Sequence, residues 1–339
     1  MNHLINHSKK LIWLCPKSKK AIGGVKIIYR QASLVQNHFS KQGLQSYVVH
    51  PNSGNYRVSW FDSDTIVMPI KFGFRWNGKL SRSNISKIFN QSSDVVVIPE
   101  MWASKYGPQL RKNRIPYVIY VQNGYQINTG SLDDLRYSYE GASVVMVISE
   151  DAKRCVNTAF PDLEINIKRI HYSIDDALFK NSSKKENLIT YMPRKLSNHS
   201  ELVLFFLQAR LPANWRIEKI ENMSEMQVAS LLKRSRIFMS FSNFEGCPLP
   251  PLEAGLTGNF IVGYTGQGGR EYWIDDIYHA IEEGDVIGFA NKVLENISII
   301  DNGLSKENHK LKIQKLMNTY SKNAELNDIQ EILSCLELI

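Results

Sequence analysis

Two glutamates, Glu245 and Glu253, lie eight residues apart in a segment rich in glycine and proline, and this spacing is the strongest sign of chemistry in the sequence. Gly-Cys-Pro-Leu-Pro-Pro-Leu separates them, and an apolar run precedes them. Proline suits the extended approach and the first turn of a helix, where a missing N–H costs little. We therefore expect a strand, a tight turn and then a helix. Backbone N–H groups at such a helix start bind phosphates and other anions.

The glutamate pair has two chemical interpretations. Two carboxylates can act as general acid and base in a glycosidase, but eight residues across a turn do not fix the separation that this mechanism needs. Alternatively, Glu253 accepts hydrogen bonds from the hydroxyls of a ribose and Glu245 contacts a sugar. Two merely exposed glutamates fit poorly, because proline, glycine and apolar residues enclose both.

Gly23 and Gly24 follow the first apolar run of the chain and precede a helical pattern. Glycine lets the backbone approach a diphosphate or a sugar closely, and a helix start adds N–H donors. The pair is not a G-x-G-x-x-G fingerprint, and His50 and Pro51 stand where NAD binding would need an acidic residue. The pattern disfavours NAD and leaves two alternatives, a diphosphate or sugar site and an ordinary turn.

Arg194 and Lys195 follow another apolar run, residues 188–192. Negative charge builds on a diphosphate as it leaves the group to which it was bonded, and neighbouring cations stabilise that charge. These two residues are therefore candidates for holding a diphosphate. A solvated pair of cations at the end of a strand is the alternative.

Short apolar runs alternate with helical patterns along the chain, which predicts parallel sheets with right-handed crossovers. In the first half we expect strands at 11–15, 46–50, 65–70, 94–98, 116–121, 143–148 and 167–171, and helices at 28–39, 81–90, 104–113, 132–139 and 150–159. In the second half we expect strands at 188–192, 215–220, 236–240, 259–263 and 278–281, and helices at 200–210, 224–233, 250–257, 268–274, 285–297, 305–320 and 323–338. Ser224 and Gln227 form a predicted capping box.

A polar stretch at 181–187 interrupts the alternation and is interpreted as a linker. The predicted organisation is a first Rossmann-like domain at 1–180, a second at 188–302, and terminal helices at 303–339, with packing of these helices back on the first domain left open. Ligands of open parallel sheets bind at the carboxyl ends of the strands, where Gly23, Gly24 and the glutamate pair all lie.

Composition narrows the class of protein. The chain has 339 residues, 43% of them apolar, and a net charge of +8. Its four cysteines are scattered and its histidines form no ligand cluster, so we expect neither a disulfide framework nor a metal site. No nucleic-acid motif accompanies the basic charge, which favours phosphate-bearing substrates or a membrane surface. The absence of a long apolar run or a signal-peptide core predicts a cytoplasmic protein, with peripheral contact to the inner face of the membrane left open.

Residues 238–271 resemble the E-x7-E region of retaining, nucleotide-sugar-dependent glycosyltransferases of the GT-B fold, family 4 and its relatives. The resemblance includes Ser242-Asn243-Phe244-Glu245-Gly246, Leu249-Pro250, Leu252-Glu253-Ala254 and Gly268-Gly269 with Glu271. Upstream, Ser173-Ile174-Asp175 with Leu178-Phe179 is similar to the segment that ends the first domain of that family. The resemblance implies two Rossmann-like domains facing each other across a cleft.

The resemblance also implies roles for individual residues. The catalytic group would be Glu245 beside the transferred sugar, with Arg194 and Lys195 neutralising the diphosphate. Glu253 would bind the ribose. Donor contacts would come from the backbone of Gly23, Gly24, Gly246, Cys247 and Leu249. The family has a second cation five residues after the arginine, where this sequence has His199, so Lys195 either replaces it or the site holds less charge.

In such enzymes the first domain binds the acceptor. Asn123 stands where the family has a histidine that contacts the sugar. Trp76, in a loop of aromatic and basic residues at 71–83, and Glu100 with Trp102, after the predicted strand 94–98, are further candidates, each with simple loop packing as the alternative. Asp62-Ser63-Asp64 matches a metal motif of a different glycosyltransferase fold but precedes a strand, so we interpret it as a polar turn.

The predicted function is transfer of a sugar from a nucleoside diphosphate to a glycan or lipid-linked acceptor, with retention, in bacterial envelope polysaccharide synthesis. The nucleotide sugar is a substrate, so no cofactor and no metal is expected. Two alternatives remain open. One is another enzyme on the same scaffold, such as an epimerase or a phosphorylase, and the other is a non-catalytic module that binds glycan or nucleic acid.

Overall fold

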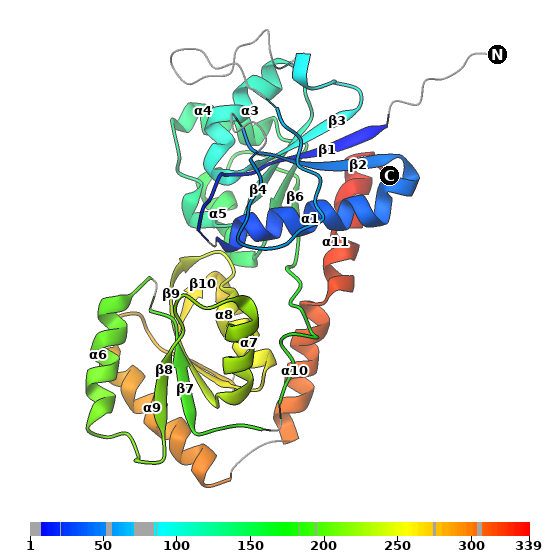
Figure 1. Cartoon of the computed structure of the whole chain (residues 1–339). Coiled ribbons are helices and arrows are strands. Elements are labelled where there is room, and N and C mark those ends of the chain that lie inside the picture. The colour runs from blue at the N-terminus through cyan, green and yellow to red at the C-terminus, as the bar shows by residue number, and fades with distance from the viewer. Residues whose placement is uncertain are drawn as a thin grey trace, which may run out of the picture. The chain divides into compact units, whose positions relative to one another are not determined.

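A computed structural model describes residues 8–20, 22–51, 56–70, 85, 87–182, 184–193, 195–273, 276–303 and 307–339. The chain forms two compact units (Figure 1). The N-terminal unit comprises Met1–Ile170 with Leu326–Ile339, and the C-terminal unit comprises His171–Glu325. The boundary along the chain thus falls between Ile170 and His171, ten residues before the boundary expected from the sequence, and the last residues, from Leu326, belong to the N-terminal unit.

The N-terminal unit contains a six-stranded parallel sheet in the order β2-β1-β3-β4-β5-β6. Its strands are β1 (Lys9–Leu14), β2 (Leu44–Val49), β3 (Asp94–Pro99), β4 (Tyr117–Val121), β5 (Val144–Val147) and β6 (Ile167–Arg169). Its helices are α1 (Gly23–Phe39), α3 (Ala103–Lys112), α4 (Leu132–Glu140) and α5 (Glu150–Ala159). Because the central strands are buried on both faces, they read as continuous apolar runs, which is why the sequence revealed them.

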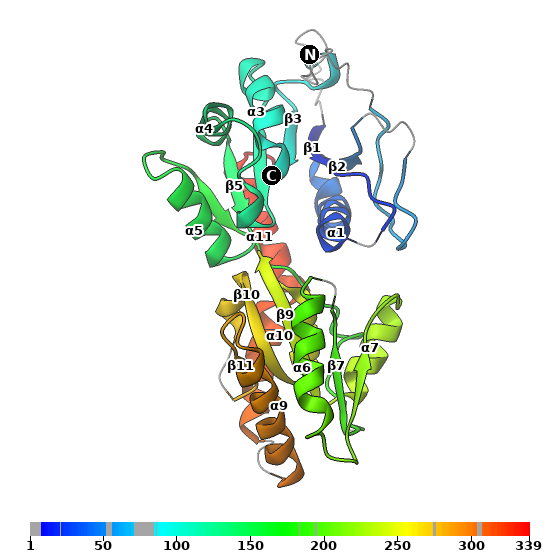
Figure 2. The ribbon, with the colours of Figure 1, turned by 90° about the vertical axis from the view of Figure 1, so that its left-hand side faces the viewer.

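Successive side chains of this sheet point to opposite faces and meet different helices. Ile12 and Leu14 of β1 pack with residues of α3, α4 and α5. Leu11 and Trp13 point to the other face, toward α1 and toward α11 (Lys322–Cys335). Figure 2 shows α1 on one side of the sheet and α3, α4 and α5 on the other.

The C-terminal unit contains a five-stranded parallel sheet in the order β11-β10-β9-β7-β8. Its strands are β7 (Leu188–Tyr191), β8 (Arg216–Lys219), β9 (Ile237–Glu245), β10 (Phe260–Gln267) and β11 (Tyr278–Ala280). Its helices are α6 (Ser197–Gln208), α7 (Glu225–Arg234), α8 (Leu249–Leu256), α9 (Val286–Asp301) and α10 (Glu307–Thr319). The buried residues of α6 and α9 form one core with the sheet, and α8 contacts both α7 and α10. Two parallel Rossmann-like sheets confirm the predicted fold class.

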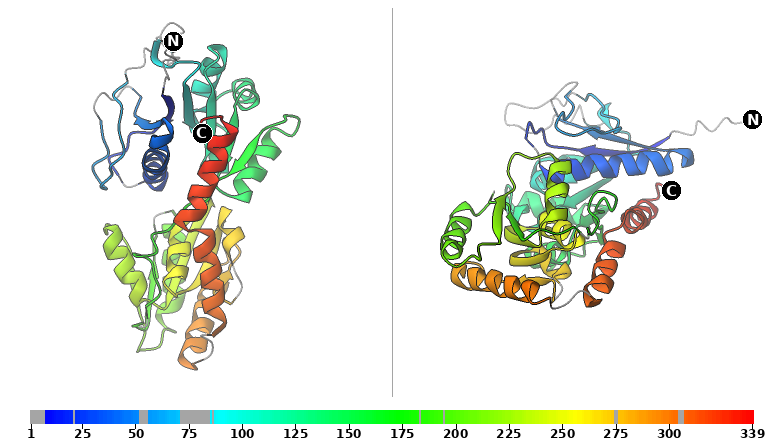
Figure 3. Two further views of the ribbon diagram at one scale, coloured as in Figure 1. Left: turned by 90° about the vertical axis from the view of Figure 1, so that its right-hand side faces the viewer. Right: turned by 60° about the horizontal axis from the view of Figure 1, so that its bottom comes forward.

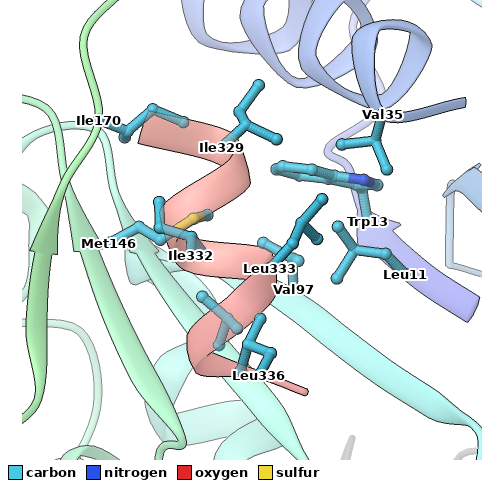
Figure 4. Close-up of a pocket in the computed structure, with 11 residues that line it drawn as sticks. Leu11, Trp13, Val35, Val97, Met146, Ile170, Ile329, Ile332, Leu333 and Leu336 are labelled. Atoms are coloured by element: carbon cyan, nitrogen blue, oxygen red, sulfur yellow. The ribbon is translucent and has the colours of Figure 1, made fainter. Parts of the chain in front are cut away.

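The last two helices belong to different units. Helix α10 lies in the C-terminal unit, and α11 from Leu326 onward belongs to the N-terminal unit (Figure 3). Ile329, Ile332, Leu333 and Leu336 of α11 cover a cavity beside Trp13 (Figure 4). This cavity measures about 10 Å³, the room for one water molecule at most, so it is a packing defect and not a ligand site. The alternative in which terminal helices pack back on the first domain is therefore confirmed for α11.

Two predicted elements differ in the structure. Residues 65–70 form no strand: Val67 makes a single bridge to Val48, in which the N–H of Val48 donates to Ile66 and the N–H of Met68 donates to Val48. The helix expected at 268–274 is a 3₁₀ turn at Gly268–Tyr272. The predicted capping box is confirmed, with Ser224 and Gln227 exchanging hydrogen bonds at the start of α7. The helix expected at 81–90 falls largely on residues outside the described ranges.

The polar stretch predicted as a linker is anchored in the C-terminal unit. Nζ of Lys185 donates hydrogen bonds to the carbonyl oxygens of Leu232, Ser235 and Thr257, at 3.3, 2.8 and 2.7 Å. These carbonyls lie at the ends of α7 and α8, where helix carbonyls have no partner within the helix. Burial lowers the pKa of Lys185 to about 7. The side chain therefore ties two helix ends together.

Candidate active site

The turn between β9 and α8 is built as the sequence predicted. Strand β9 ends at Glu245, and Pro248 is the N-cap of α8, with no side chain capping the helix. Prolines at 248, 250 and 251 have no N–H. Backbone donors at this helix start are therefore concentrated on Gly246, Cys247 and Leu249, as an anion site requires. Gly246 and Cys247 are buried, and Leu249 is half-buried.

The glycine-rich loop after β10 packs directly on this turn. A Cβ at Gly268 would lie 1.8 Å from the carbonyl oxygen of Gly246, and one at Gly266 would lie 2.7 Å from Cβ of Ser242. No larger residue fits there. The hydroxyl of buried Tyr272 donates to the carbonyl oxygen of Pro248 at 2.5 Å. The shape of the turn is thus fixed from outside by tertiary contacts.

Lys195 and Glu245 form an ion pair at this turn. The Nζ of Lys195 lies 3.0 Å from Oε1 of Glu245, with 35% and 27% of the two side chains exposed. Lys195 comes from the loop after β7, and Glu245 ends the adjacent strand β9. Two of the predicted catalytic residues are therefore in contact. Both remain accessible to a ligand, because each side chain is about one third exposed.

Glu253 lies in the second turn of α8 and is half-buried. The same helix presents Leu249 at its start, so the ribose candidate and one of the anion-binding candidates share one rigid element. Arg194 lies outside the described residues. His199, at the position of the missing second cation, is in α6, where its Nδ1 lies 3.1 Å from the hydroxyl of Tyr264.

In the N-terminal unit, Gly23 and Gly24 begin α1, and no side chain caps this helix. The side chain of Gln122 packs on the helix start: its Nε2 donates to the carbonyl oxygen of Gly24 at 3.1 Å. A Cβ at Gly24 would lie 2.7 Å from Oε1 of Gln122, whereas one at Gly23 would meet nothing within 4 Å. A side chain at position 24 would thus displace the flexible amide of Gln122, whereas one at position 23 would displace nothing. No pattern in the sequence points to Gln122, because only the pairing of strands brings the loop after β4 beside the loop after β1.

Glu100 is buried behind these loops. Its carboxylate accepts hydrogen bonds from the backbone N–H of Asn123, at 3.1 Å, and of Gln122, at 3.3 Å. Burial raises the pKa of Glu100 to about 7, and the backbone hydrogen bonds partly offset that effect. With 2% of its surface exposed, Glu100 cannot touch an acceptor as it stands. Glu100 instead holds the backbone of Gln122 and Asn123 in place. The side chain of Gln122 then makes the hydrogen bond to Gly24.

The remaining acceptor candidates are placed as follows. Asn123 is half-buried, and its side chain accepts a hydrogen bond from the N–H of Tyr125 at 3.0 Å. Trp102 is half-buried and packs edge-on against Tyr106. Trp76 lies outside the described residues. In the predicted polar turn, Asp64 accepts hydrogen bonds from Ser33 and Asn37 of α1, which is a structural role.

Among the described residues, no group of three His, Cys, Asp or Glu is arranged to hold a metal ion. In the same part of the chain, no helix is long and apolar enough to cross a membrane.

No known protein-family model matches the sequence. An alpha-1,6-glucosyltransferase of Actinobacillus pleuropneumoniae serotype 7 (strain AP76) is 25% identical over 220 residues, which cover 62% of this chain and 66% of that protein. The match thus spans just under two thirds of the length of this curated relative.

Solved structures match over nearly the whole chain. HepE of Anabaena in complex with UDP has a TM-score of 0.68 at 12% identity, covering 97% of this chain and 100% of HepE. A glycosyltransferase from Rickettsia africae ESF-5 has a TM-score of 0.73 at 14% identity, covering 97% and 99% of the two chains. A sucrose-phosphate synthase from Thermosynechococcus elongatus has a TM-score of 0.72 at 12% identity, with the same coverage. The chain therefore has the GT-B fold.

Proposed function

We propose that this protein is a glycosyltransferase that moves a hexose from a nucleoside diphosphate to a glycan or lipid-linked acceptor, with retention of configuration. The turn at residues 245–248 carries the proposal: it combines a helix start, a partly exposed carboxylate and a cation at the carboxyl end of a parallel sheet. The GT-B fold and the glucosyltransferase relative support the same conclusion.

In the proposed mechanism, α8 binds the donor. Backbone N–H groups of Gly246, Cys247 and Leu249 hold the sugar and the diphosphate, and Glu253 accepts hydrogen bonds from the ribose. Gly23 and Gly24, at the start of α1, are further candidates for backbone contacts to a sugar or a diphosphate. These groups position the donor, and positioning lowers the barrier because the entropy of alignment is lost on binding and not in the chemical step.

Charge stabilisation comes from the cations. Lys195, together with Arg194, neutralises the diphosphate as its bond to the sugar breaks. The departing phosphate then takes the proton of the acceptor hydroxyl, which attacks the same face of the sugar, so configuration is retained. Glu245 stabilises positive charge on the sugar and orients its hydroxyls. No metal takes part in this scheme.

We infer a uridine nucleotide as the donor, because HepE structures were solved with UDP and with UDP-glucose. The name of the curated relative suggests glucose as the sugar. We further propose that the protein acts in the cytoplasm, or peripherally on the inner face of the membrane, in the synthesis of a bacterial cell-surface polysaccharide. The net charge of +8 suits both an anionic donor and an anionic surface.

A thermal-shift panel tests the proposal. UDP, GDP, ADP, CMP and TDP, each with a corresponding sugar nucleotide, are added to the purified protein. A ligand present at 100 times its dissociation constant stabilises the folded state by about 2.7 kcal/mol, which gives a clear shift. The nucleotide that binds is then supplied as a radiolabelled sugar donor with candidate glycans. Binding without any transfer would favour the alternative of a non-catalytic module, and no binding at all would contradict the proposal.

A further inference from the structure

Phe244, which directly precedes Glu245, is exposed although its neighbours in the strand are not. The aromatic residues Phe238 and Phe241 of β9 are 1% and 4% exposed, whereas Phe244 is 53% exposed. Residues 238–271 are all described, and Phe244 is the one large apolar side chain of that segment that is exposed. A single exposed apolar residue needs no explanation by itself. The backbone of Phe244 does need one.

Strand β9 contains a bulge at this position. Ser242 pairs with Thr265 and Glu245 pairs with Gln267, so three residue steps of β9 oppose two steps of β10. The φ angle of Phe244 is +46°, in the left-handed region that bulky residues avoid. A bulge re-aims a side chain, and bulges are frequent beside active sites. The extra residue interrupts the regular alternation of side chains along β9. The ring of Phe244 is therefore exposed, whereas Phe238, earlier in the strand, is buried.

The strained backbone is enforced by its surroundings. The glycine-rich loop presses on both sides of Phe244: Gly266 is packed against Ser242, and Gly268 against the carbonyl of Gly246. Strain of this kind persists only where neighbouring structure over-determines it. Glycine would adopt the same backbone without strain, yet a phenylalanine stands here. The position therefore keeps an aromatic ring that stability alone does not favour.

We propose that Phe244 is a stacking platform for a pyranose ring. A pyranose has an apolar face of C–H groups and a rim of hydroxyls. The ring of Phe244 matches the apolar face, while the neighbouring Glu245–Lys195 pair offers an acceptor and a donor for the rim. The ligand is a saccharide, either the sugar of the donor or a sugar of the acceptor. The proposal deepens the proposed function and rests on it.

The test uses full-length protein with four substitutions. Phe244→Gly and Phe244→Asn remove the ring but suit the left-handed backbone, since both residues adopt positive φ readily. Phe244→Tyr and Phe244→Trp keep an aromatic ring. Because strain is relieved, the glycine and asparagine variants should melt at the wild-type temperature or above it. Any loss of activity is then not a loss of folding.

The readouts separate the two sources of the sugar. UDP and UDP-glucose are titrated into each variant, and transfer is measured with methyl glycosides of glucose, galactose and N-acetylglucosamine as acceptors. If the ring holds the donor sugar, affinity for UDP-glucose falls about tenfold in the glycine and asparagine variants while affinity for UDP is unchanged. If it holds the acceptor, the KM for the glycoside rises about tenfold, with kcat within about twofold. The tyrosine and tryptophan variants should behave as wild type.

Three outcomes overturn the proposal. Wild-type affinity and KM in the glycine and asparagine variants would show that the ring binds no sugar. Equal losses in all four variants would show a structural role, because ring-bearing residues should rescue binding. A wild-type protein that neither binds nor uses a nucleotide sugar would refute the proposed function, and this inference with it.

Discussion

The Nζ atom of Lys195 lies 3.0 Å from Oε1 of Glu245, so the loop after β7 and the end of β9 are joined by an ion pair at the candidate site. Ion pairs this exposed contribute at most about 1 kcal/mol to stability. Lys195→Met and Glu245→Gln should therefore change the free energy of unfolding by less than about 1 kcal/mol. If the two residues stabilise charge in the transition state, kcat for sugar transfer should fall about 100-fold in each variant.

A second ion pair provides a matched control. Lys292 and Glu295 of α9 are 2.6 Å apart, with 33% and 54% of their side chains exposed. Lys292→Met and Glu295→Gln should change neither turnover nor stability appreciably. Urea denaturation and initial transfer rates measure the two quantities. Full turnover in both Lys195→Met and Glu245→Gln would exclude this pair from the chemistry.

Glu253→Gln should weaken nucleotide binding. A carboxylate accepts two strong hydrogen bonds from a ribose diol, whereas an amide offers one neutral acceptor and a donor. Loss of that charge-assisted contact should lower affinity for UDP about tenfold, with little change in kcat at saturating donor. Isothermal titration with UDP checks the affinity, with Glu295→Gln as the control. An unchanged dissociation constant would remove Glu253 from the ribose site.

Gly24 and Gly23 should respond differently to the same substitution. Gly24→Ala places a methyl group 2.7 Å from Oε1 of Gln122, whose flexible amide must turn aside, so it should cost the hydrogen bond of Gln122 to Gly24, about 0.5–1.5 kcal/mol. Gly23→Ala meets no atom within 4 Å and should be neutral or slightly stabilising. Gln122→Ala removes the same hydrogen bond, so adding it to Gly24→Ala should cause little further loss. Equal effects of the two alanine variants, measured by thermal denaturation, would contradict the contact.

Glu100 should make stability depend on pH. Burial raises its folded pKa to about 7, above the ordinary value of 4.5. Its contribution is therefore fully present below pH 4.5 and is lost as pH rises through 7. Between pH 5 and pH 8 the loss should be about 2–3 kcal/mol. Urea denaturation of wild type and Glu100→Gln at both pH values measures it.

The difference between wild type and Glu100→Gln isolates this carboxyl group. His50 acts in the opposite direction, because burial lowers its pKa to about 4 and its contribution is lost as pH falls from about 6.5. His50 is present in both proteins, so its effect cancels when the two are compared. A difference that stays constant from pH 5 to pH 8 would show that Glu100 is ionised throughout.

The fold was predictable because the patterns that indicate its strands and helices each lie within a short stretch of the sequence. Strands such as β3 and β4 are buried on both faces, so each is a short apolar run that stands out between helical patterns. Helix starts were predictable for the same reason: the capping box of Ser224 and Gln227 needs only residues close in sequence. The prediction failed at residues 65–70, where an apolar run forms only a single bridge to β2.

The sequence by itself determined the alternation of strands and helices, and hence the parallel sheets and the turn at Glu245. Tertiary structure alone decided the ion pair of Lys195 with Glu245, the contact of Gln122 with Gly24 and the bulge that exposes Phe244. Each of these depends on which strands pair and in which register. Strand pairing joins residues far apart in the chain, so no pattern within a short window encodes it.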